Sequence, residues 1–409
     1  MLHIVTPYHQ LRREVHHPRR TVREDRRSPP YHRVSSLRTT EGIVKVHREV
    51  APTSSDRYVH VVSVDVELVR AIPKVELHCH IEGTMRASTV ADLATKNGIA
   101  LEHEDPAEMY VYDDLTGFLE IFWLVQSVLQ TPDDWERLAY ESLVDGATHG
   151  LRYREAFFTP ARHLLAGQSL ADIVAALDRG LGLADRDSGI RGRLIFDIDR
   201  EFGPDVATEH VAELVDLRRS GSAGTDRVIG LGMDSTELGV DPRSFAVPYG
   251  LARDAGLRLT AHQGENSPAS AVASAIDDLG CERIDHGISV FEDPELVRRV
   301  VDERIPFTVC PNANVRINPD VVDRVEDHVF DAMRRAGILA ALNTDDPALV
   351  GLDLTAEYQL TAQAYDYDLD ELYDIASDAV ESSWLDDSDA ASLRAEITAS
   401  RNAATPPDR

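Results

Sequence analysis

The chain has 409 residues and a formal charge of −29, because 71 acidic side chains stand against 42 basic ones, and 43% of its residues are hydrophobic. A surface this negative repels nucleic acid and anionic membranes, so the expected partner is a small molecule rather than a polyanion. A run of about 18 apolar residues and an apolar signal segment are both absent, which argues against a membrane span and against secretion. The three cysteines form no CxxC pair and fit a reducing cytoplasm. The sequence leaves the oligomeric state open.

Residues 1–65 differ in composition from the rest of the chain. Residues 1–55 contain 11 basic and 5 acidic side chains and 6 of the 16 histidines, without helical or strand periodicity. This composition predicts a disordered basic arm, although a misassigned start codon would explain the same change. A basic arm can bind nucleic acid, but the acidity of the remaining chain makes that role the less favoured one.

From about residue 72, short apolar runs alternate with longer amphipathic stretches. The runs predict strands at residues 75–80, 151–158, 193–199, 228–234, 257–263, 283–287, 306–310 and 339–344. The stretches between them predict helices. Eight strands separated by helices favour an α/β fold, a (β/α)8 TIM barrel spanning residues 66–385. A doubly wound open sheet would need a glycine-rich phosphate turn after an early strand, and the sequence has none.

About 70 residues separate the first two predicted strands. This long connection has apolar anchors at Phe118, Phe122 and Trp123, and it predicts extra helices over the C-terminal mouth of the barrel with these residues as a lid. The alternative is that the three aromatic residues form the core of those helices. At the other end of the chain, residues 386–409 are rich in acidic residues and alanine and are expected to form a C-terminal tail.

Histidines stand at the ends of the predicted strands, where barrel enzymes place their active sites. The first strand ends in HCHIEG, so His78 and His80 point to one side. Two imidazoles on one inward face make half of a zinc site. The fifth strand ends in HQGE, where His262 offers a third imidazole and Glu265, in the loop beyond, can face a substrate as proton donor and acceptor.

The sixth and eighth strands end in IDHG and LNTDDP, which place His286, Asp345 and Asp346 at the same edge. Adjacent carboxylates diverge, so one can bind a metal while the other binds a substrate. Taken singly, each of these residues is explained as a hydrogen-bonded buried side chain or a helix cap. Their joint position favours a metal site. A single metal is expected, because no lysine follows Lys96 to bridge two ions, and the HxE and PCxxC pair of cytidine-deaminase-type enzymes is absent.

Seven segments appear in order between residues 72 and 365: PKVELHCHIEGT, LRYREAFFTPARH, VIGLGMDSTELG, LTAHQGEN, ERIDHG, FTVCPNANV and ALNTDDP. Together they resemble the adenosine/adenine deaminase family of the amidohydrolase superfamily, in which the first 65 and last 25 residues have no counterpart. The resemblance implies one Zn²⁺ per chain, held by His78, His80, His262 and Asp345. It also implies hydrolytic removal of the 6-amino group of an adenine purine, with release of ammonia.

The resemblance further implies roles for the other polar residues. Glu265 would protonate purine N1, His286 would orient the attacking hydroxide, and Asp346 would bond near N7 and pass protons to the leaving ammonia. Glu82 and Ser235 are substrate-binding candidates that stand where adenosine deaminases usually have Asp and Gly. This leaves adenosine, adenine and a modified adenine open as substrates. Hydrolysis of another amidine and a catalytically silent binding barrel are the alternatives.

Overall fold

The apolar runs of the chain form parallel strands that alternate with helices. The computed structural model describes residues 64–101 and 106–404. One sheet contains, side by side, β1 (Lys74–His80), β2 (Leu151–Phe158), β3 (Arg191–Asp199), β4 (Val228–Asp234) and β5 (Arg258–Leu259). A second sheet contains β6 (His262–Gln263), β7 (Ile284–His286), β8 (Phe307–Val309) and β9 (Ala340–Leu342). Every neighbouring pair is parallel.

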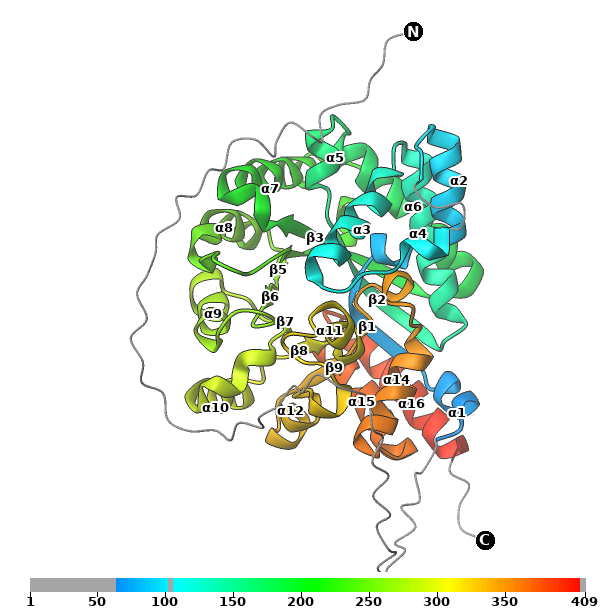
Figure 1. Ribbon diagram of the computed structural model, residues 1–409, viewed down its shortest axis with the longest axis vertical. Helices are drawn as coiled ribbons and strands as arrows, with labels where there is room; N and C mark the ends of the chain where they lie inside the picture. Colours follow the sequence, from blue (N-terminus) through cyan, green and yellow to red (C-terminus); the bar gives the residue numbers. More distant parts are fainter. Residues whose placement is uncertain (1–63, 102–105, 405–409) are drawn as a thin grey trace, which may run out of the picture. The chain divides into compact units, whose positions relative to one another are not determined.

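The two sheets are parts of one ring. β5 and β6 are pieces of the single fifth strand predicted from the sequence, and Thr260 N, between them, donates to Leu231 O of β4 at 2.9 Å. On the other side, Asp345 pairs with Cys79 of β1 in a parallel bridge, supported by backbone hydrogen bonds of 2.9 and 3.2 Å. The chain therefore has the predicted (β/α)8 barrel fold, and Figure 1 shows its helices around the strands.

Sixteen α-helices precede, separate and follow the strands of the described residues. They are α1 (Val66–Ala71), α2 (Ala87–Asn97), α3 (Leu115–Ser127), α4 (Pro132–Ala147), α5 (Ala161–Leu165), α6 (Leu170–Ser188), α7 (Gly203–Arg219), α8 (Ala246–Asp254), α9 (Ala269–Ser274), α10 (Pro294–Asp302), α11 (Pro311–Ile317), α12 (Phe330–Ala336), α13 (Pro347–Val350), α14 (Leu354–Tyr365), α15 (Leu369–Ser382) and α16 (Asp387–Ala404). Among these helices, none combines the length and apolar character needed to cross a bilayer.

Local sequence explains where these helices begin and end. The side chain of Ser169 accepts a hydrogen bond from the backbone of Asp172 and caps α6, while Gly189 ends the helix with φ of 74°. A serine side chain at the N-cap accepts a hydrogen bond from a backbone N–H group that has no partner within the helix. Glycine adopts the left-handed conformation at the C-terminal end, which lets backbone N–H groups bond to the last carbonyls. The buried face of α6 carries leucine, isoleucine and valine at helical spacing.

The long connection between β1 and β2 forms α2, α3 and α4, as the sequence predicted. Helix α3 carries Leu115, Phe118, Leu119 and Phe122, which line the same pocket as residues at the carboxyl ends of the strands. The side-chain hydroxyl of Tyr112, just before α3, donates to Leu349 O at 3.3 Å and ties this segment to α13, which follows β9. The extra helices therefore cover the mouth of the barrel.

The predicted basic arm and the predicted C-terminal tail have different outcomes. Almost all of the basic arm lies outside the described residues, which begin at Val64. Within the predicted C-terminal tail, residues 387–404 form α16, which packs against α15 and buries Leu393 and Ile397. Arg401 of α16 pairs with Asp370 and Asp374 of α15 at 2.8 and 2.7 Å.

The barrel interior is filled at the amino ends of the strands. Arg283, directly before β7, is fully buried and pairs with the buried Glu155 of β2 at 2.6 Å. Its guanidinium lies 3.8 Å from the ring centre of Trp384, whose backbone N also donates to Glu155. A side chain at Gly230 of β4 would approach this indole to 2.5 Å, so the tryptophan occupies that space. Together, Arg283, Glu155 and Trp384 form a plug at this end.

Substitution of Arg283 by methionine should lower the free energy of unfolding by about 3–5 kcal/mol, because the carboxylate of Glu155 would remain buried without its partner. Arg298→Met is the matched control, since Arg298 pairs with Glu295 at the surface and its loss should cost less than about 1 kcal/mol. Urea denaturation of both variants tests this. Equal losses in the free energy of unfolding would show that the buried Arg283–Glu155 pair stabilises the fold no more than a surface ion pair does.

Candidate active site

Four side chains meet at the carboxyl ends of the strands. His78 and His80 lie on β1, His262 begins β6 and Asp345 follows β9, and one ligand atom of each lies within 4.8 Å of the others. All four residues are buried. The structure thus brings together the metal ligands that the resemblance implied, from strands that are far apart in the sequence.

The spacing of these atoms fits a tetrahedral metal ion. His80 Nε2 lies 3.1 Å from His262 Nε2, and Asp345 Oδ1 lies 3.3 Å from His78 Nε2 and 3.5 Å from His80 Nε2. Ligands at the usual zinc distances of about 2.0–2.1 Å stand roughly 3.4 Å apart at the corners of a tetrahedron. Burial lowers the pKa of His80 to about 4, and burial with the neighbouring imidazoles holds the pKa of His262 well below its ordinary value. Neutral imidazole is the form that binds a metal.

A buried carboxylate stands behind two of the imidazoles. Asp285 Oδ2 lies 3.8 Å from His262 Nδ1, and Asp285 Oδ1 lies 4.0 Å from His78 Nδ1. Thr260 Oγ1 and Thr308 Oγ1 donate to this carboxylate at 2.8 and 2.6 Å, and Thr308 Oγ1 also contacts His78 Nδ1 at 3.2 Å. Partners of this kind orient metal-binding imidazoles and select the nitrogen that faces the metal.

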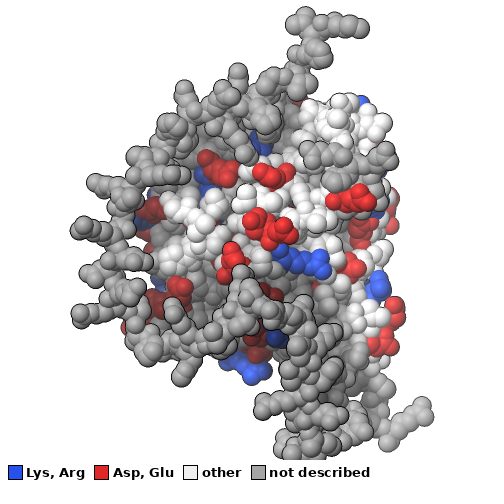
Figure 2. Space-filling view, in the orientation of Figure 1, with Lys and Arg blue, Asp and Glu red and all other residues white. Residues whose placement is uncertain are grey.

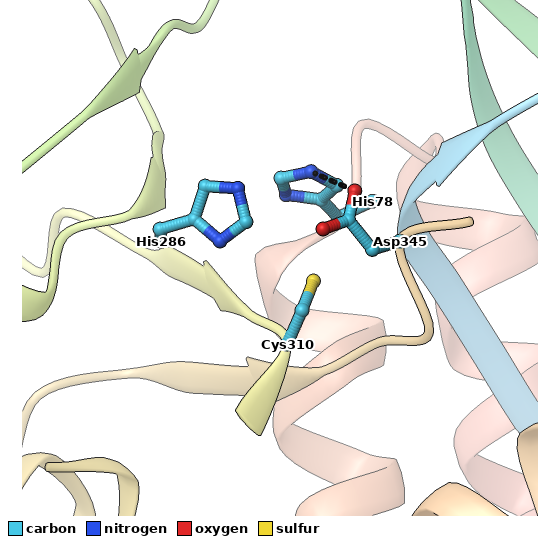
Figure 3. A group of neighbouring side chains, drawn as sticks. All are labelled: His78, His286, Cys310 and Asp345. Carbon is cyan, nitrogen blue, oxygen red and sulfur yellow. Dashed lines mark ion pairs between the residues drawn. The ribbon is translucent and has the colours of Figure 1, made fainter. Parts of the chain in front are cut away.

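A second set of ligand atoms overlaps the first. His78 and Asp345 also lie close to His286 and Cys310, and Figure 3 shows the Cys310 sulfur pointing toward the other three side chains. Burial raises the pKa of the Cys310 thiol well above its ordinary value, and Asp345 adds to the shift. Because a thiol must lose its proton to bind a metal, the set of three histidines and Asp345 is the better metal site.

Glu265 faces the same pocket from the loop after β6. Its Oε1 accepts hydrogen bonds from Asn314 Nδ2 at 2.8 Å and Asn318 Nδ2 at 2.7 Å, and it lies 4.0 Å from His286 Nε2. Burial raises the pKa of this carboxyl above its ordinary value. A carboxyl that keeps its proton more firmly than usual suits a general acid.

The loop that carries Glu265 is held by a second glutamate. Glu237 accepts hydrogen bonds from Gly264 N at 2.7 Å, Glu265 N at 3.0 Å and Gln263 Nε2 at 2.8 Å. Gly264 has φ of 84°, and a Cβ there would lie 2.5 Å from Val272, so the turn requires glycine. Glu265 is therefore presented on a fixed backbone rather than on a free loop.

Three more buried carboxyls lie beside the metal ligands. Thr159 N donates to Glu82 Oε1 at 2.9 Å and Thr159 Oγ1 donates to Asp234 Oδ2 at 2.7 Å. Among the described residues, Glu82 Oε2, Asp234 Oδ1 and Asp346 Oδ1 have no hydrogen-bond partner. Burial raises the pKa of Glu82 to about 7 and those of Asp234 and Asp346 well above their ordinary range. Neutral carboxyls both donate and accept hydrogen bonds, so this group can recognise a heterocyclic base.

Ser235, His286 and Asp345 all have a left-handed backbone, with φ of 68°, 62° and 65°. Each such residue costs of order 1–3 kcal/mol and persists only where its surroundings enforce this backbone. All three lie where a strand ends and line the inner pocket. This strained backbone turns their side chains into the pocket at the points where the strands stop.

The predicted lid residues occupy two different places. Phe118 and Phe122 are buried, their rings stack at 6.0 Å, and Phe122 lies 5.9 Å from the ring of His80. They line a small inner pocket of about 50 Å³ at the carboxyl ends of the strands. Trp123 instead lines a larger outer cavity, where the Arg162 guanidinium covers its ring at 4.0 Å. On the face that Figure 2 shows, acidic side chains cover more of the described surface than basic ones.

Reasoning from the sequence missed several residues of the site. Asp234, Asp285, Cys310 and Asn314 all stand in segments that were recognised, namely GMDSTE, ERIDHG and CPNAN. Asp234 ends β4 and Cys310 follows β8, so the strand-end rule that found the histidines would also have included these two. Asp285 lies within β7 and Asn314 within α11, where that rule does not apply. Their pairing with particular neighbours depends on contacts across the barrel.

A (β/α)8 barrel that gathers imidazoles and carboxylates at the carboxyl ends of its strands defines this protein as a barrel hydrolase with a candidate metal centre. A family model described as adenosine deaminase matches residues 73–400. The chain belongs to the adenosine deaminase family. The resemblance read from the motifs is confirmed, but the match extends well into α16, so the expectation that the last 25 residues have no counterpart was wrong.

Individual relatives agree with this assignment. An adenine deaminase of Streptomyces coelicolor is 38% identical over 337 residues, which cover 81% of this chain and 96% of the relative. The crystal structure of an adenine deaminase from Arthrobacter aurescens is 35% identical, has a TM-score of 0.76 and covers 80% of this chain and 99% of its own. An amidohydrolase from Burkholderia ambifaria with bound Zn is 32% identical, has a TM-score of 0.77 and covers 86% and 97%.

Proposed function

We propose that this protein hydrolyses adenine to hypoxanthine and ammonia and uses one zinc ion. The observation that carries the proposal is a single pocket lined by His80, His262 and Asp345 together with Glu265 and Asp346. The metal donors and the proton-carrying groups therefore face the same bound molecule. The similarity to adenine deaminases supports the choice of substrate.

His78, His80, His262 and Asp345 would hold the zinc ion, because their ligand atoms have the spacing that zinc requires and the lowered pKa values of His80 and His262 keep those two imidazoles neutral. Zinc in this site would act as a Lewis acid that makes water nucleophilic near neutral pH. Asp285 and Thr308 would keep the imidazoles in the orientation that binds it.

Glu265, His286 and Asp346 would donate and transfer protons and orient the attacking water during the reaction. Glu265 transfers its proton to purine N1, which makes C6 electrophilic, and this hydrogen remains on N1 in hypoxanthine. His286 bonds to the attacking oxygen and sets its approach to C6. Asp346 bonds near N7 and passes one proton of the attacking water to the amino group, which leaves as ammonia when the C6–N6 bond breaks. The second hydrogen of that water returns to the Glu265 carboxylate as the C6 carbonyl forms, which restores the acid.

Buried carboxyls favour the free base over the nucleoside. Adenine carries a hydrogen on its imidazole ring, whereas N9 of adenosine carries ribose and cannot donate. The unpartnered oxygens of Glu82 and Asp234 are acceptors for such a hydrogen, and their protonated forms can donate to a ring nitrogen. A ribose in the same place would leave these buried carboxyls without a hydrogen-bond partner, and this cost would discriminate strongly against adenosine.

The proposal is tested by assaying zinc-loaded protein with adenine and adenosine separately, following purine absorbance and ammonia release. Turnover of adenine with at least about 10²-fold lower kcat/KM for adenosine is expected. Comparable rates would contradict selection of the free base. Absence of turnover on both, in protein that holds one metal ion per chain, would contradict the proposed reaction.

Glu82→Gln should lower kcat/KM for adenine about 10- to 100-fold, because one hydrogen bond to a charged or acidic group is worth about 1.5–3 kcal/mol. The substitution keeps the size of the side chain and its acceptor for Thr159 N. Metal content and thermal stability should not change. An unchanged kcat/KM would remove Glu82 from the substrate contacts.

The protein's setting follows from the same observations. The three cysteines are all buried and free among the described residues, which fits a reducing compartment such as the cytoplasm. There the reaction would serve purine salvage, with adenine and water as its partners.

A further inference from the structure

His328 lies outside the pocket but is connected to it. It stands just before α12, is 4% exposed, and does not line the inner pocket. Its Nε2 lies 3.1 Å from Asn314 Oδ1, and Asn314 contacts both Glu265 and His286. A buried histidine thus sits one side chain away from two residues to which the proposed function gives chemical roles.

The protonation pattern of His328 is set by the backbone. Phe330 N donates to His328 Nδ1 at 3.1 Å, so this nitrogen carries no hydrogen. Burial lowers the pKa of His328 to about 3, and the ring is therefore neutral with its single hydrogen on Nε2. That N–H group can only donate, and its acceptor is Asn314 Oδ1.

This donor fixes the amide of Asn314 in one orientation. With Oδ1 held by His328, Nδ2 must face the pocket, where it lies 2.8 Å from Glu265 Oε1 and 3.1 Å from His286 Nδ1. The amide has two N–H hydrogens, and these are the two acceptors within reach. An amide turned by 180° would place its oxygen against both acceptors, which would leave His286 Nδ1 without this donor and Glu265 Oε1 with Asn318 Nδ2 alone.

The orientation of the Asn314 amide determines which ring nitrogen of His286 carries a hydrogen. Its Nδ1 accepts a hydrogen bond and carries no hydrogen, so in the neutral ring the hydrogen is on Nε2. The orientation of an imidazole and the nitrogen that carries its proton are commonly set by a neighbour in this way.

The state of Glu265 follows as well. Its Oε1 accepts from both Asn314 and Asn318, at 2.8 and 2.7 Å. An oxygen that already accepts two N–H bonds is a poor place for a proton, so the acidic hydrogen is on Oε2. This is the oxygen that remains free to meet a substrate.

We infer that His328 is a positioning residue which, through Asn314, fixes the Nε2–H tautomer of His286 and directs the acidic proton of Glu265 to Oε2. This inference rests on the proposed function, because that function gives His286 and Glu265 their chemical roles. The tautomer of His286 can nevertheless be measured without any turnover of substrate. It assigns a part in the reaction to a residue that contacts neither the substrate nor the metal ligands.

Two substitutions separate positioning from simple support of the fold. His328→Gln keeps an N–H donor near the place of Nε2, whereas His328→Leu keeps the bulk and removes the donor. In the zinc-loaded enzyme we expect the leucine variant to lose about 10- to 100-fold in kcat with KM changed less than about threefold. The glutamine variant should recover most of that loss. Melting temperature and metal content are recorded for both.

The decisive readout is the tautomer of His286. Nitrogen-15 spectra of histidine-labelled zinc enzyme, with the His286 signals identified by their absence in His286→Gln, should show one Nε2–H tautomer in the wild type and His328→Gln. His328→Leu should show a mixture. A single unchanged tautomer in His328→Leu, or an equal loss of kcat in the glutamine and leucine variants, would overturn the inference. If the tautomers change as expected but no variant or wild type deaminates adenine, the inference holds and the proposed function fails.

Discussion

Replacement of Glu265 by glutamine should lower kcat for adenine by about 10²–10⁴-fold while KM changes little. The glutamine oxygen can still accept from Asn314 and Asn318, which turns the amide NH₂ group toward the substrate. Purine N1 would then receive a hydrogen bond but no proton, and C6 would stay a poor electrophile. Steady-state kinetics with adenine, together with metal analysis of the purified variant, measure this effect.

The control for this experiment is Glu282→Gln, the same chemical change at an exposed residue near the amino end of β7. Its pair with Arg258 lies at the surface, so kcat and metal content should match the wild type. If Glu265→Gln retained more than about a tenth of wild-type kcat, the residue could not be the general acid. If the variant lost its zinc instead, its effect would be structural.

Asp345→Asn should weaken zinc binding by more than about 10²-fold. Loss of a residue that only hydrogen-bonds to a ligand typically lowers metal affinity by about 10- to 100-fold, and loss of a charged ligand itself lowers it further. Asparagine tolerates the left-handed backbone that Asp345 has, with φ of 65°, so the substitution changes the ligand and not the turn. Competition with a chelator, followed by metal analysis, gives the change in affinity, and deaminase activity should fall with zinc content.

The chain offers a closely matched control for this substitution. Asp366 also has a left-handed backbone, with φ of 56°, but it is exposed at the end of α14. Asp366→Asn should leave zinc affinity and activity unchanged. Asp285→Asn should fall between the two variants, since Asp285 orients the imidazoles from behind. Full zinc occupancy of Asp345→Asn at wild-type affinity would exclude Asp345 as a ligand.

The fold and the meeting of the candidate metal ligands were predictable because both depend on regular spacing. Alternating strands and helices predict a barrel, and the carboxyl ends of its strands share one edge. His78, His262 and Asp345 could therefore be expected to meet without knowledge of any single contact. The same logic placed the extra helices over the mouth, since a long apolar insertion between the first two strands has to cover something.

The relations among side chains were not predictable in this way. The link from His328 through Asn314 to Glu265 and His286 joins four segments of the chain and depends on hydrogen bonds of 2.8–3.1 Å. No spacing in the sequence relates position 328 to position 265. The break of the fifth strand into β5 and β6 and the closeness of Cys310 to His286 likewise depend on the curvature of the finished barrel.

The plug of Arg283, Glu155 and Trp384 has a consequence for the order of events in a catalytic cycle. Because the amino end of the barrel is filled, substrate and both products have to pass the carboxyl end, beneath α3. Hypoxanthine keeps the ring system of adenine and would rest against the same residues until it leaves. Entry of the next adenine therefore waits for departure of the last hypoxanthine, and accumulated product would compete with substrate for the free enzyme.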